Sequence, residues 1–170
     1  MTISRLKELP REEIIREMAK QFGDLNPSSL EAMIMLYKFL GDYDKAFEDH
    51  FKKFGLSDGR FHVLITIKKN NNAIKATDIA NNLGVSRATM TGLMDGLIKD
   101  GLISKTDCSE DRRISFVHLT EKGQELLGKV VPCHFKKLDK FSQCLNKEEV
   151  KVFKECISKL SNNLDKIAKD

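Results

Sequence analysis

The chain has 170 residues, of which 41% are hydrophobic and 32% charged, and it contains no tryptophan. This length suits about one domain with its own apolar core and excludes a large multidomain enzyme. Lys and Arg number 29 against 25 Asp and Glu, and the resulting net charge of +4 permits a nucleic-acid partner without requiring one. No apolar run approaches the roughly 20 residues of a membrane span, and the N-terminus has no apolar signal core. We therefore expect a cytoplasmic protein with no membrane segment.

The spacing of cysteine and histidine argues against a metal site. The cysteines at 108, 133, 144 and 156 form no CxxC pair, and the histidines at 50, 62, 118 and 134 never fall at i and i+4. The usual nucleotide-binding, zinc-protease and hydrolase motifs do not occur in the sequence either. We expect free thiols, no metal, no cofactor and no enzymatic activity.

Helical periodicity dominates the first 70 residues. Pro10 precedes a short amphipathic helix with apolar residues at positions 14, 15, 18, 19 and 22. After Asn26-Pro27, Ser28 or Ser29 is expected to cap a second helix that includes Phe54 and is roughly 40 Å long. Such a helix is longer than a compact monomer needs, so part of it is expected to contact a second chain. Ser57 caps a third helix, which ends at the turn of residues 68–72.

Two short helices and a hairpin are expected next. The first helix lies between Ile74 and Leu83 and stops at Gly84. Ser86 caps the second helix, whose apolar residues repeat at helical spacing. Residues 102–107 and 113–119 alternate between polar and apolar around a polar loop, which is typical of a β-hairpin.

The last third of the chain is predicted to be helical. Pro132 is expected to kink or break a helix that follows the capping residue Thr120. Asn146 and Glu149 form a capping box for the final helix. That helix carries a seam of apolar residues spaced three and four apart, namely Val150, Phe153, Ile157, Leu160, Leu164 and Ile167. We expect this seam to pack against another helix, and together with the long second helix it favours a homodimer.

Residues 79–93 have the pattern of a DNA-binding helix-turn-helix. Ala80 allows two helices to cross closely and Gly84 suits the left-handed turn, while apolar residues at 79, 83, 90 and 93 lock the helices together. An ordinary helical corner remains an alternative, because it needs only the glycine and the apolar residues. The outward face of the second helix suits a DNA groove, or alternatively a solvated surface, and carries Arg87, Thr91, Asp95 and Lys99.

Three motifs, in this order and spacing, resemble the winged helix of the multiple antibiotic resistance regulator (MarR) family. They are Gly101-Leu102-Ile103, Asp111-Arg112-Arg113 and Leu119-Thr120-Glu121-Lys122-Gly123. The resemblance covers roughly residues 28–169 and implies a mainly α protein: a winged helix-turn-helix, built from a three-helix core and a β-hairpin wing, with terminal helices that dimerise. The implied segments are 1–54 for dimerisation and one wall of an effector pocket, 55–119 for DNA binding and 120–170 for dimerisation.

The resemblance also implies roles for individual residues. Recognition-helix contacts to DNA would fall on Ser86, Arg87, Thr89 and Thr91. Arg112 and Arg113 would enter the minor groove, and Asp111 would orient an arginine. Lys75 stands where the family often has a Ser or Thr cap, which weakens the cap and adds a candidate phosphate contact. An effector pocket would draw on Tyr37, Phe47, Phe61 and His62, although aromatic residues at such positions also suit a core.

These observations predict a sequence-specific transcriptional regulator, specifically a ligand-responsive repressor that binds a near-palindromic operator in double-stranded DNA as a homodimer. Its effector would be an aromatic or amphipathic small molecule. Residues 51–76 carry a net charge of +5 and residues 8–50 a net charge of −5, so a dimer would be polarised, although residues 77–119 alone sum to −1. The alternative is a winged-helix protein–protein interaction module, which would bind through apolar contacts rather than through salt-sensitive arginines.

Overall fold

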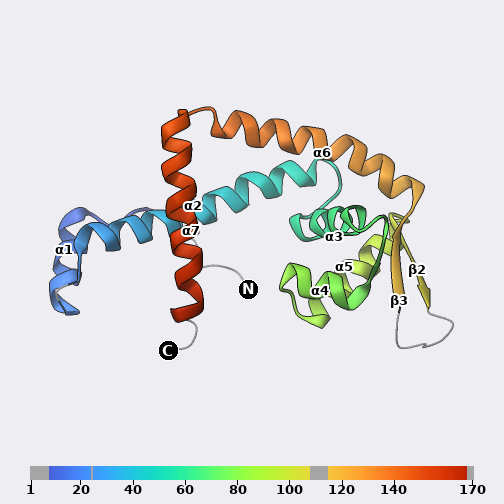
Figure 1. Ribbon diagram of the computed structural model, residues 1–170, viewed down its shortest axis with the longest axis horizontal. Helices are drawn as coiled ribbons and strands as arrows, with labels where there is room; N and C mark the ends of the chain where they lie inside the picture. The colour runs from blue at the N-terminus through green and yellow to red at the C-terminus, as the bar shows by residue number, and fades with distance from the viewer. Residues whose placement is uncertain (1–7, 24, 108–114, 168–170) are drawn as a thin grey trace. The chain divides into compact units, whose positions relative to one another are not determined.

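The computed structural model describes residues 8–23, 25–107 and 115–167 of the chain. The chain divides into two compact units, Met1–Leu127 and Gly128–Asp170. Within the described residues the structure is mainly helical, with one small sheet in the first unit (Figure 1). None of the described helices is long and apolar enough to cross a bilayer.

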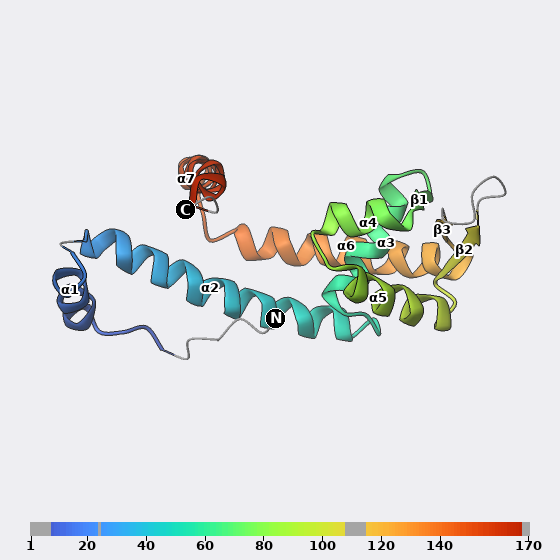
Figure 2. The same cartoon turned by 90° about the horizontal axis from the view of Figure 1, so that it is seen from below.

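The first unit begins with a helical pair, α1 (Glu12–Gln21) and α2 (Pro27–Lys52). Ile15 and Ala19 of α1 are buried where this helix packs against α2 (Figure 2). The prediction of a serine cap for α2 is wrong: the Asn26 side chain accepts a hydrogen bond from the Ser29 N–H at 3.1 Å. Asn26 is extended and Pro27 has its φ preset for the first helical position, so the helix begins there.

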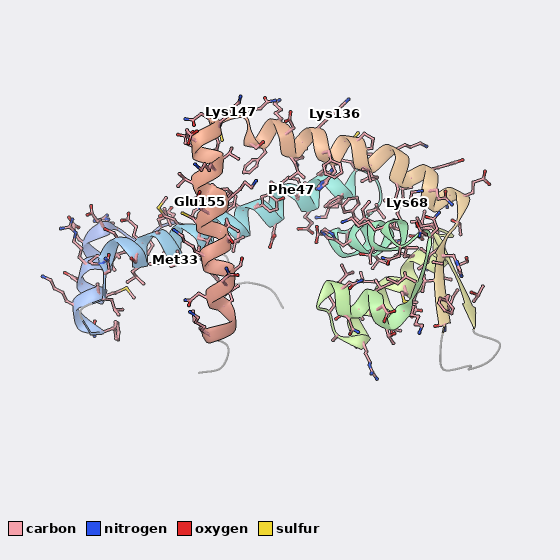
Figure 3. All side chains as sticks on the ribbon, in the orientation of Figure 1. Met33, Phe47, Lys68, Lys136, Lys147 and Glu155 are labelled. Carbon is pink, nitrogen blue, oxygen red and sulfur yellow. The ribbon has the colours of Figure 1, made fainter. Side chains whose placement is uncertain are left out.

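Helix α2 has 26 residues and is therefore about 39 Å long. It ends at Lys52, so Phe54 lies beyond it rather than on its apolar face. Buried residues lie only in its second half and include Phe47 and Phe51. Earlier in α2, Met33, which is labelled in Figure 3, is 43% exposed. The first half of α2 therefore presents apolar surface that the described residues of its own unit leave exposed.

Helix α3 (Asp58–Lys69) begins at the predicted cap, where the Ser57 hydroxyl accepts a hydrogen bond from the Arg60 N–H at 3.3 Å. Its core residues Val63, Leu64 and Ile67 are fully buried. The predicted turn follows, with Asn71 and Asn72 both at positive φ, a conformation that asparagine tolerates better than most residues.

The expected helix from Ile74 is wrong at its start, because residues Ala73–Lys75 form strand β1 and the helix α4 covers Ala76–Leu83. Ile74 lies opposite Val117 of β3 (Ser115–Leu119), and both side chains are buried. Burial against a strand more than 40 residues away overrides the local helical pattern.

The predicted hairpin is confirmed: its first strand begins one residue later than expected, and the predicted start of the second strand at residue 113 lies outside the described residues. Strand β2 (Ile103–Asp107) pairs antiparallel with β3, with Ile103 opposite Leu119, and β1 joins the other side of β3 to give the order β1-β3-β2. Figure 2 shows the strands beside α3, α4 and α5 (Arg87–Lys99). Apolar side chains from these helices and strands form one core, to which Ile79, Leu97 and Val117 contribute fully buried side chains.

Helix α6 (Glu121–Ser142) begins at Thr120 as predicted. The Thr120 hydroxyl accepts a hydrogen bond from the Gly123 N–H at 3.1 Å and donates one to the Gly101 carbonyl oxygen at 2.7 Å. The first turn of α6 passes so close to the strand that a Cβ on Gly123 would collide with the Leu102 carbonyl oxygen. The helix continues through Pro132, so the predicted break does not occur.

Helix α7 (Lys147–Ile167) lies in the second unit, and its predicted capping box is confirmed. The Asn146 side chain accepts from the Glu149 N–H at 3.0 Å, and the Glu149 carboxylate accepts from the Asn146 N–H at 2.8 Å. Every residue of the apolar seam is exposed, from 36% at Val150 to 64% at Ile167.

Candidate nucleic-acid interface

The turn between α4 and α5 has the geometry that the sequence predicted. Gly84 adopts a left-handed conformation, with φ of 62°, directly after α4. The Val85 N–H then donates to the Ala80 carbonyl oxygen at 3.2 Å, which closes the end of α4. Ile79 and Ala80 of α4 and Met90, Met94 and Leu97 of α5 are buried. The apolar face of each helix is therefore used for packing, and only the polar face of α5 is left for a partner.

The N-terminal turn of α5 collects the predicted recognition residues. The Ser86 hydroxyl accepts from the Thr89 N–H at 3.1 Å and lies 2.9 Å from the Thr89 hydroxyl. The Thr91 hydroxyl donates to the Arg87 carbonyl oxygen at 2.9 Å. The hydroxyls of Ser86 and Thr91 thus have hydrogen-bond partners within the helix, whereas the exposed Arg87 side chain has no hydrogen-bond or ion-pair partner among the described residues.

This helix end also suits a phosphate electrostatically. Its first turn holds no acidic residue, so the partial positive charge of the helix N-terminus is not neutralised by a neighbouring carboxylate. A Cβ on Gly92 would meet no atom within 4 Å, so the exposed side of α5 is unobstructed at that position. Together these features make the first two turns of α5 the best-suited surface for a groove among the described residues.

Basic side chains lie on neighbouring elements of the same unit. Lys75 is exposed at the end of β1 and precedes α4, and it makes no side-chain capping hydrogen bond, as its chemistry predicts. Lys68, labelled in Figure 3, and Lys69 are exposed in the last turn of α3. These lysines add positive charge next to residues 77–119, whose own net charge is −1.

The wing is described at its strands only. Its two strands are paired along their full length, from Ile103 opposite Leu119 to Asp107 opposite Ser115. The Thr106 hydroxyl and the His118 Nε2 lie 2.9 Å apart on adjacent strands. Cys108, Asp111, Arg112 and Arg113 lie outside the described residues, so their predicted roles stay predictions.

Sequence reasoning missed a polar cluster at the other end of α5. The Arg60 guanidinium pairs with the Asp100 carboxylate, donates to the Gly96 carbonyl oxygen at 3.2 Å and reaches the Gly55 carbonyl oxygen at 3.5 Å. By this hydrogen bond and its charge, Arg60 holds the pKa of Asp100 below its usual value. Arg60 and Asp100 are 40 positions apart in the sequence, so no local pattern could predict the pair.

The predicted effector residues are divided between core and surface. Phe47 and Phe61 are buried, and both belong to a chain of aromatic rings in which Tyr43 lies 4.3 Å from Phe47 and Phe51 lies 4.5 Å from Phe61 between ring centroids. Figure 3 labels Phe47 on α2. Burial, followed by the charge of Asp58, raises the pKa of Tyr43.

Tyr37 and His62 are exposed, and Tyr37 is on α2 well before these rings. His62 is 3.3 Å from the Asp58 carboxylate, and this hydrogen bond raises the pKa of His62. The structure therefore does not gather the four side chains into one cavity wall. No group of three or more His, Cys, Asp or Glu side chains within the described ranges is arranged to hold a metal ion.

A helix pair with a glycine turn, a capped recognition helix and a following antiparallel hairpin define the class of winged helix-turn-helix proteins. Comparison with known proteins identifies the family. The MarR family model matches residues 56–115. The HTH-type transcriptional repressor YetL of Bacillus subtilis (strain 168) is 31% identical over 160 residues, which cover 94% of this chain and 96% of YetL.

Solved structures show the same fold at lower identity. AbsC, a MarR family transcriptional regulator from Streptomyces coelicolor, superposes with a TM-score of 0.75 at 20% identity, covering 83% of this chain and 97% of AbsC. The S. aureus MepR–DNA complex superposes with a TM-score of 0.68 at 17% sequence identity, covering 78% of this chain and 95% of the MepR chain. NadR in complex with 4-hydroxyphenylacetate superposes with a TM-score of 0.59 at 22% sequence identity, covering 75% of this chain and 89% of NadR.

The chain belongs to the MarR family of DNA-binding transcriptional regulators. The family is one of transcriptional regulators and not of enzymes.

Proposed function

We propose that this protein is a homodimeric repressor that binds a near-palindromic operator in duplex DNA through α5 and the wing. The observation that carries the proposal is the N-terminal end of α5, where a capped turn without acidic residues presents Arg87 beside an open helix face. An arginine there can make a bidentate contact to guanine in the major groove. The MepR–DNA complex, which shares this fold, supports DNA as the partner.

We assign the DNA contacts within this surface as follows. Arg87 reads a base edge, while Ser86, Thr89 and Thr91 contribute phosphate or base contacts in addition to their hydrogen bonds within α5. Lys75 contacts a phosphate from the end of β1. Arg112 and Arg113 of the wing enter the minor groove, and Asp111 orients one of them.

The dimer is supported by exposed apolar surface on the terminal helices. The α7 seam is 36–64% exposed, and the side chains of Ile14 and Met18 on α1 and of Phe22 directly after it are 40–64% exposed. Soluble chains rarely leave so much apolar surface uncovered, and a heptad-like seam is buried by pairing with a second helix. We therefore assign residues 1–54 and 120–170 to dimerisation and residues 55–119 to DNA binding.

An effector that is aromatic or amphipathic would act on this dimer. Tyr37 and His62 are the accessible members of the predicted set, and Phe47 and Phe61 would line such a site only from the core side. The probe we would use is 4-hydroxyphenylacetate, the ligand of the NadR complex. The site is supported if the compound weakens operator binding by the wild-type protein and has no such effect on Tyr37→Ala. Operator binding that the compound leaves unchanged counts against this compound as an effector.

The operator itself is tested by selection from a pool of random duplexes with the full-length protein. Because a two-fold relates the two recognition helices, the enriched sequence is expected to be an inverted repeat with half-sites about one helical turn apart. Light scattering on the same sample is expected to give the mass of two chains. A pool without an enriched inverted repeat would contradict the proposal and would favour a protein partner for α5.

A further inference from the structure

The C-terminal end of the recognition helix is tied to α3 by one side chain. Arg60, in the first turn of α3, donates from Nη2 to the Gly96 carbonyl oxygen at 3.2 Å and to the Asp100 carboxylate. Its Nη1 reaches back to the Gly55 carbonyl oxygen at 3.5 Å. The Arg60 side chain is only 19% exposed, so the planar guanidinium lies between the two helices and satisfies acceptors on both sides.

The two helices are in contact at this point. An added Cβ on Gly96 would lie 4.0 Å from the Arg60 guanidinium carbon, an ordinary contact distance, so the guanidinium lies directly against this part of α5. One turn away, an added Cβ on Gly59 would lie 3.3 Å from a Leu93 methyl group. Gly59 thus allows α3 to approach Leu93 of α5 closely, and Arg60 is the polar group beside this contact.

Asp100 connects the same end of α5 to α6. The Lys122 ammonium donates to the Asp100 carbonyl oxygen at 2.8 Å, and the Asp100 N–H donates to the Gly96 carbonyl oxygen at 3.1 Å. The Gly96 carbonyl oxygen therefore accepts both the helix hydrogen bond and the Arg60 bond. The C-terminal end of α5 is held by polar side chains from two other helices, α3 and α6, whereas its other end is held by the Gly84 turn, the Ser86 cap and apolar packing.

Arg60 is too far from the recognition residues to contact the same stretch of DNA. Arg87 and Asp100 are 13 residues apart on α5, a separation of about 20 Å along the helix axis. A change at Arg60 can therefore reach the DNA only through the position of α5.

We propose that Arg60 is a positioning residue that fixes the orientation of α5 and thereby the selectivity for operator over other DNA. Hydrogen bonds to base edges are lost with small displacements of the helix, while attraction to phosphates is long-ranged and tolerates them. Loss of the Arg60 contacts lets α5 shift about its Gly84 end. The protein then keeps its general affinity for duplex DNA and loses discrimination. This inference rests on the proposed function.

The test compares Arg60→Ala with the wild-type protein on two duplexes of equal length, the selected inverted repeat and a scrambled sequence. Fluorescence anisotropy at several salt concentrations gives two quantities. The first is the ratio of the affinity for the inverted repeat to the affinity for the scrambled duplex, and the second is the slope of log affinity against log salt concentration. Arg60→Ala is expected to lower the ratio about tenfold or more, comparable to one mismatched base pair per site, with an unchanged salt slope on scrambled DNA. Arg60→Lys keeps the charge but cannot serve the three acceptors together, so it is expected to lose selectivity as well.

Asn70→Ala is the matched control. It removes a side-chain hydrogen bond to the Thr66 carbonyl oxygen, 2.8 Å long, at the opposite end of α3, and is expected to leave the ratio unchanged. If Arg60→Ala does not fold, as judged by thermal unfolding, Arg60→Lys and Asp100→Asn decide the question.

The outcomes separate this inference from the proposed function. A wild-type protein without selectivity overturns both. If the wild-type protein prefers the inverted repeat and the Arg60 variants prefer it to the same degree, only the inference is overturned. A salt slope reduced by about one at constant selectivity, restored by Arg60→Lys, would make Arg60 a phosphate contact and would also overturn it.

Discussion

The winged-helix elements and the terminal helices use apolar residues in opposite ways. From α3 to β3, leucine, isoleucine and valine side chains are buried within one chain, and several are completely inaccessible. In α1, the first half of α2 and α7, apolar side chains of similar size are largely exposed. The difference lies in what covers these side chains: the winged helix completes its own core, whereas the terminal helices leave apolar surface that the proposed dimer would bury.

The largest expected effect lies in the self-contained core. Leu64→Ala removes a fully buried side chain from α3 and is expected to lower the free energy of unfolding by about 2–5 kcal/mol. Urea unfolding followed by circular dichroism measures the loss. Leu160→Ala in α7, where the side chain is 38% exposed in one chain, is the matched control. Equal losses at low protein concentration, where the dimer dissociates, would contradict the comparison.

A charge in the α7 seam tests the other region. Ile157→Asp is expected to weaken dimerisation by about 100-fold, or ~3 kcal/mol, because the carboxylate would have to be buried between chains. Sedimentation velocity over a range of concentrations measures the dissociation constant. Lys159→Asp introduces the same side chain off the seam and is expected to leave the dimer intact. A dimer unaffected by Ile157→Asp would place the interface elsewhere.

The polar face of α5 is expected to show a smaller effect confined to DNA binding. Arg87→Ala should cost about 1–3 kcal/mol of operator affinity and relax base preference at one position in each half-site. Binding to a panel of operators with single base changes measures this. Lys129→Ala, which removes an exposed positive charge from α6, serves as the control. If Arg87→Ala weakened binding to every duplex equally, Arg87 would be a phosphate contact.

Replacing both wing arginines should change salt dependence rather than base preference. The double variant Arg112→Ala and Arg113→Ala is expected to flatten the salt slope by about two, one for each charge lost, while fold and dimer persist. Asp111→Ala alone should cost less affinity. Full affinity with the original slope in the double variant would exclude the wing as a DNA contact.

The smallest expected effect concerns the pH dependence of stability. The Asp58 hydrogen bond raises the pKa of His62 above its ordinary value of 6.5, so its stabilisation is fully present below pH 6.5 and is lost as pH rises through the raised pKa. His62→Gln is expected to remove this slope from the unfolding midpoint measured between pH 6 and 8. Asp58→Asn should do the same. If the unfolding midpoint of both variants kept the wild-type slope against pH, the pH dependence would come from other titratable groups.

Local rules were sufficient for much of the fold and of the recognition helix. The caps at Ser57, Ser86, Thr120 and Asn146 depend on residues within three positions, and all four are confirmed. The Gly84 turn needs only a left-handed glycine between two apolar helices. Since α5 is built from such signals, the position of the helix and of its cap could be predicted from the sequence, while the DNA contacts assigned to it stay predictions.

Features that depend on distant partners could not be predicted in the same way. Strand β1 has three residues, and its pairing with β3 is set by residues more than 40 positions away. The Arg60 contacts to Gly96 and Asp100 have the same origin. Helical periodicity also shows that the α7 residues form a seam, but it carries no information about the chain that covers them.

The close approach of Gly123 to the Leu102 carbonyl oxygen has a consequence for how this sequence can change. A methyl group at position 123 could be accommodated only by moving α6 away from the root of the hairpin. Gly92 and Gly128 have no atom within 4 Å of an added Cβ and face no such restriction. In a saturation library selected for folded protein, codon 123 should therefore return glycine almost exclusively, while codons 92 and 128 should accept alanine and serine.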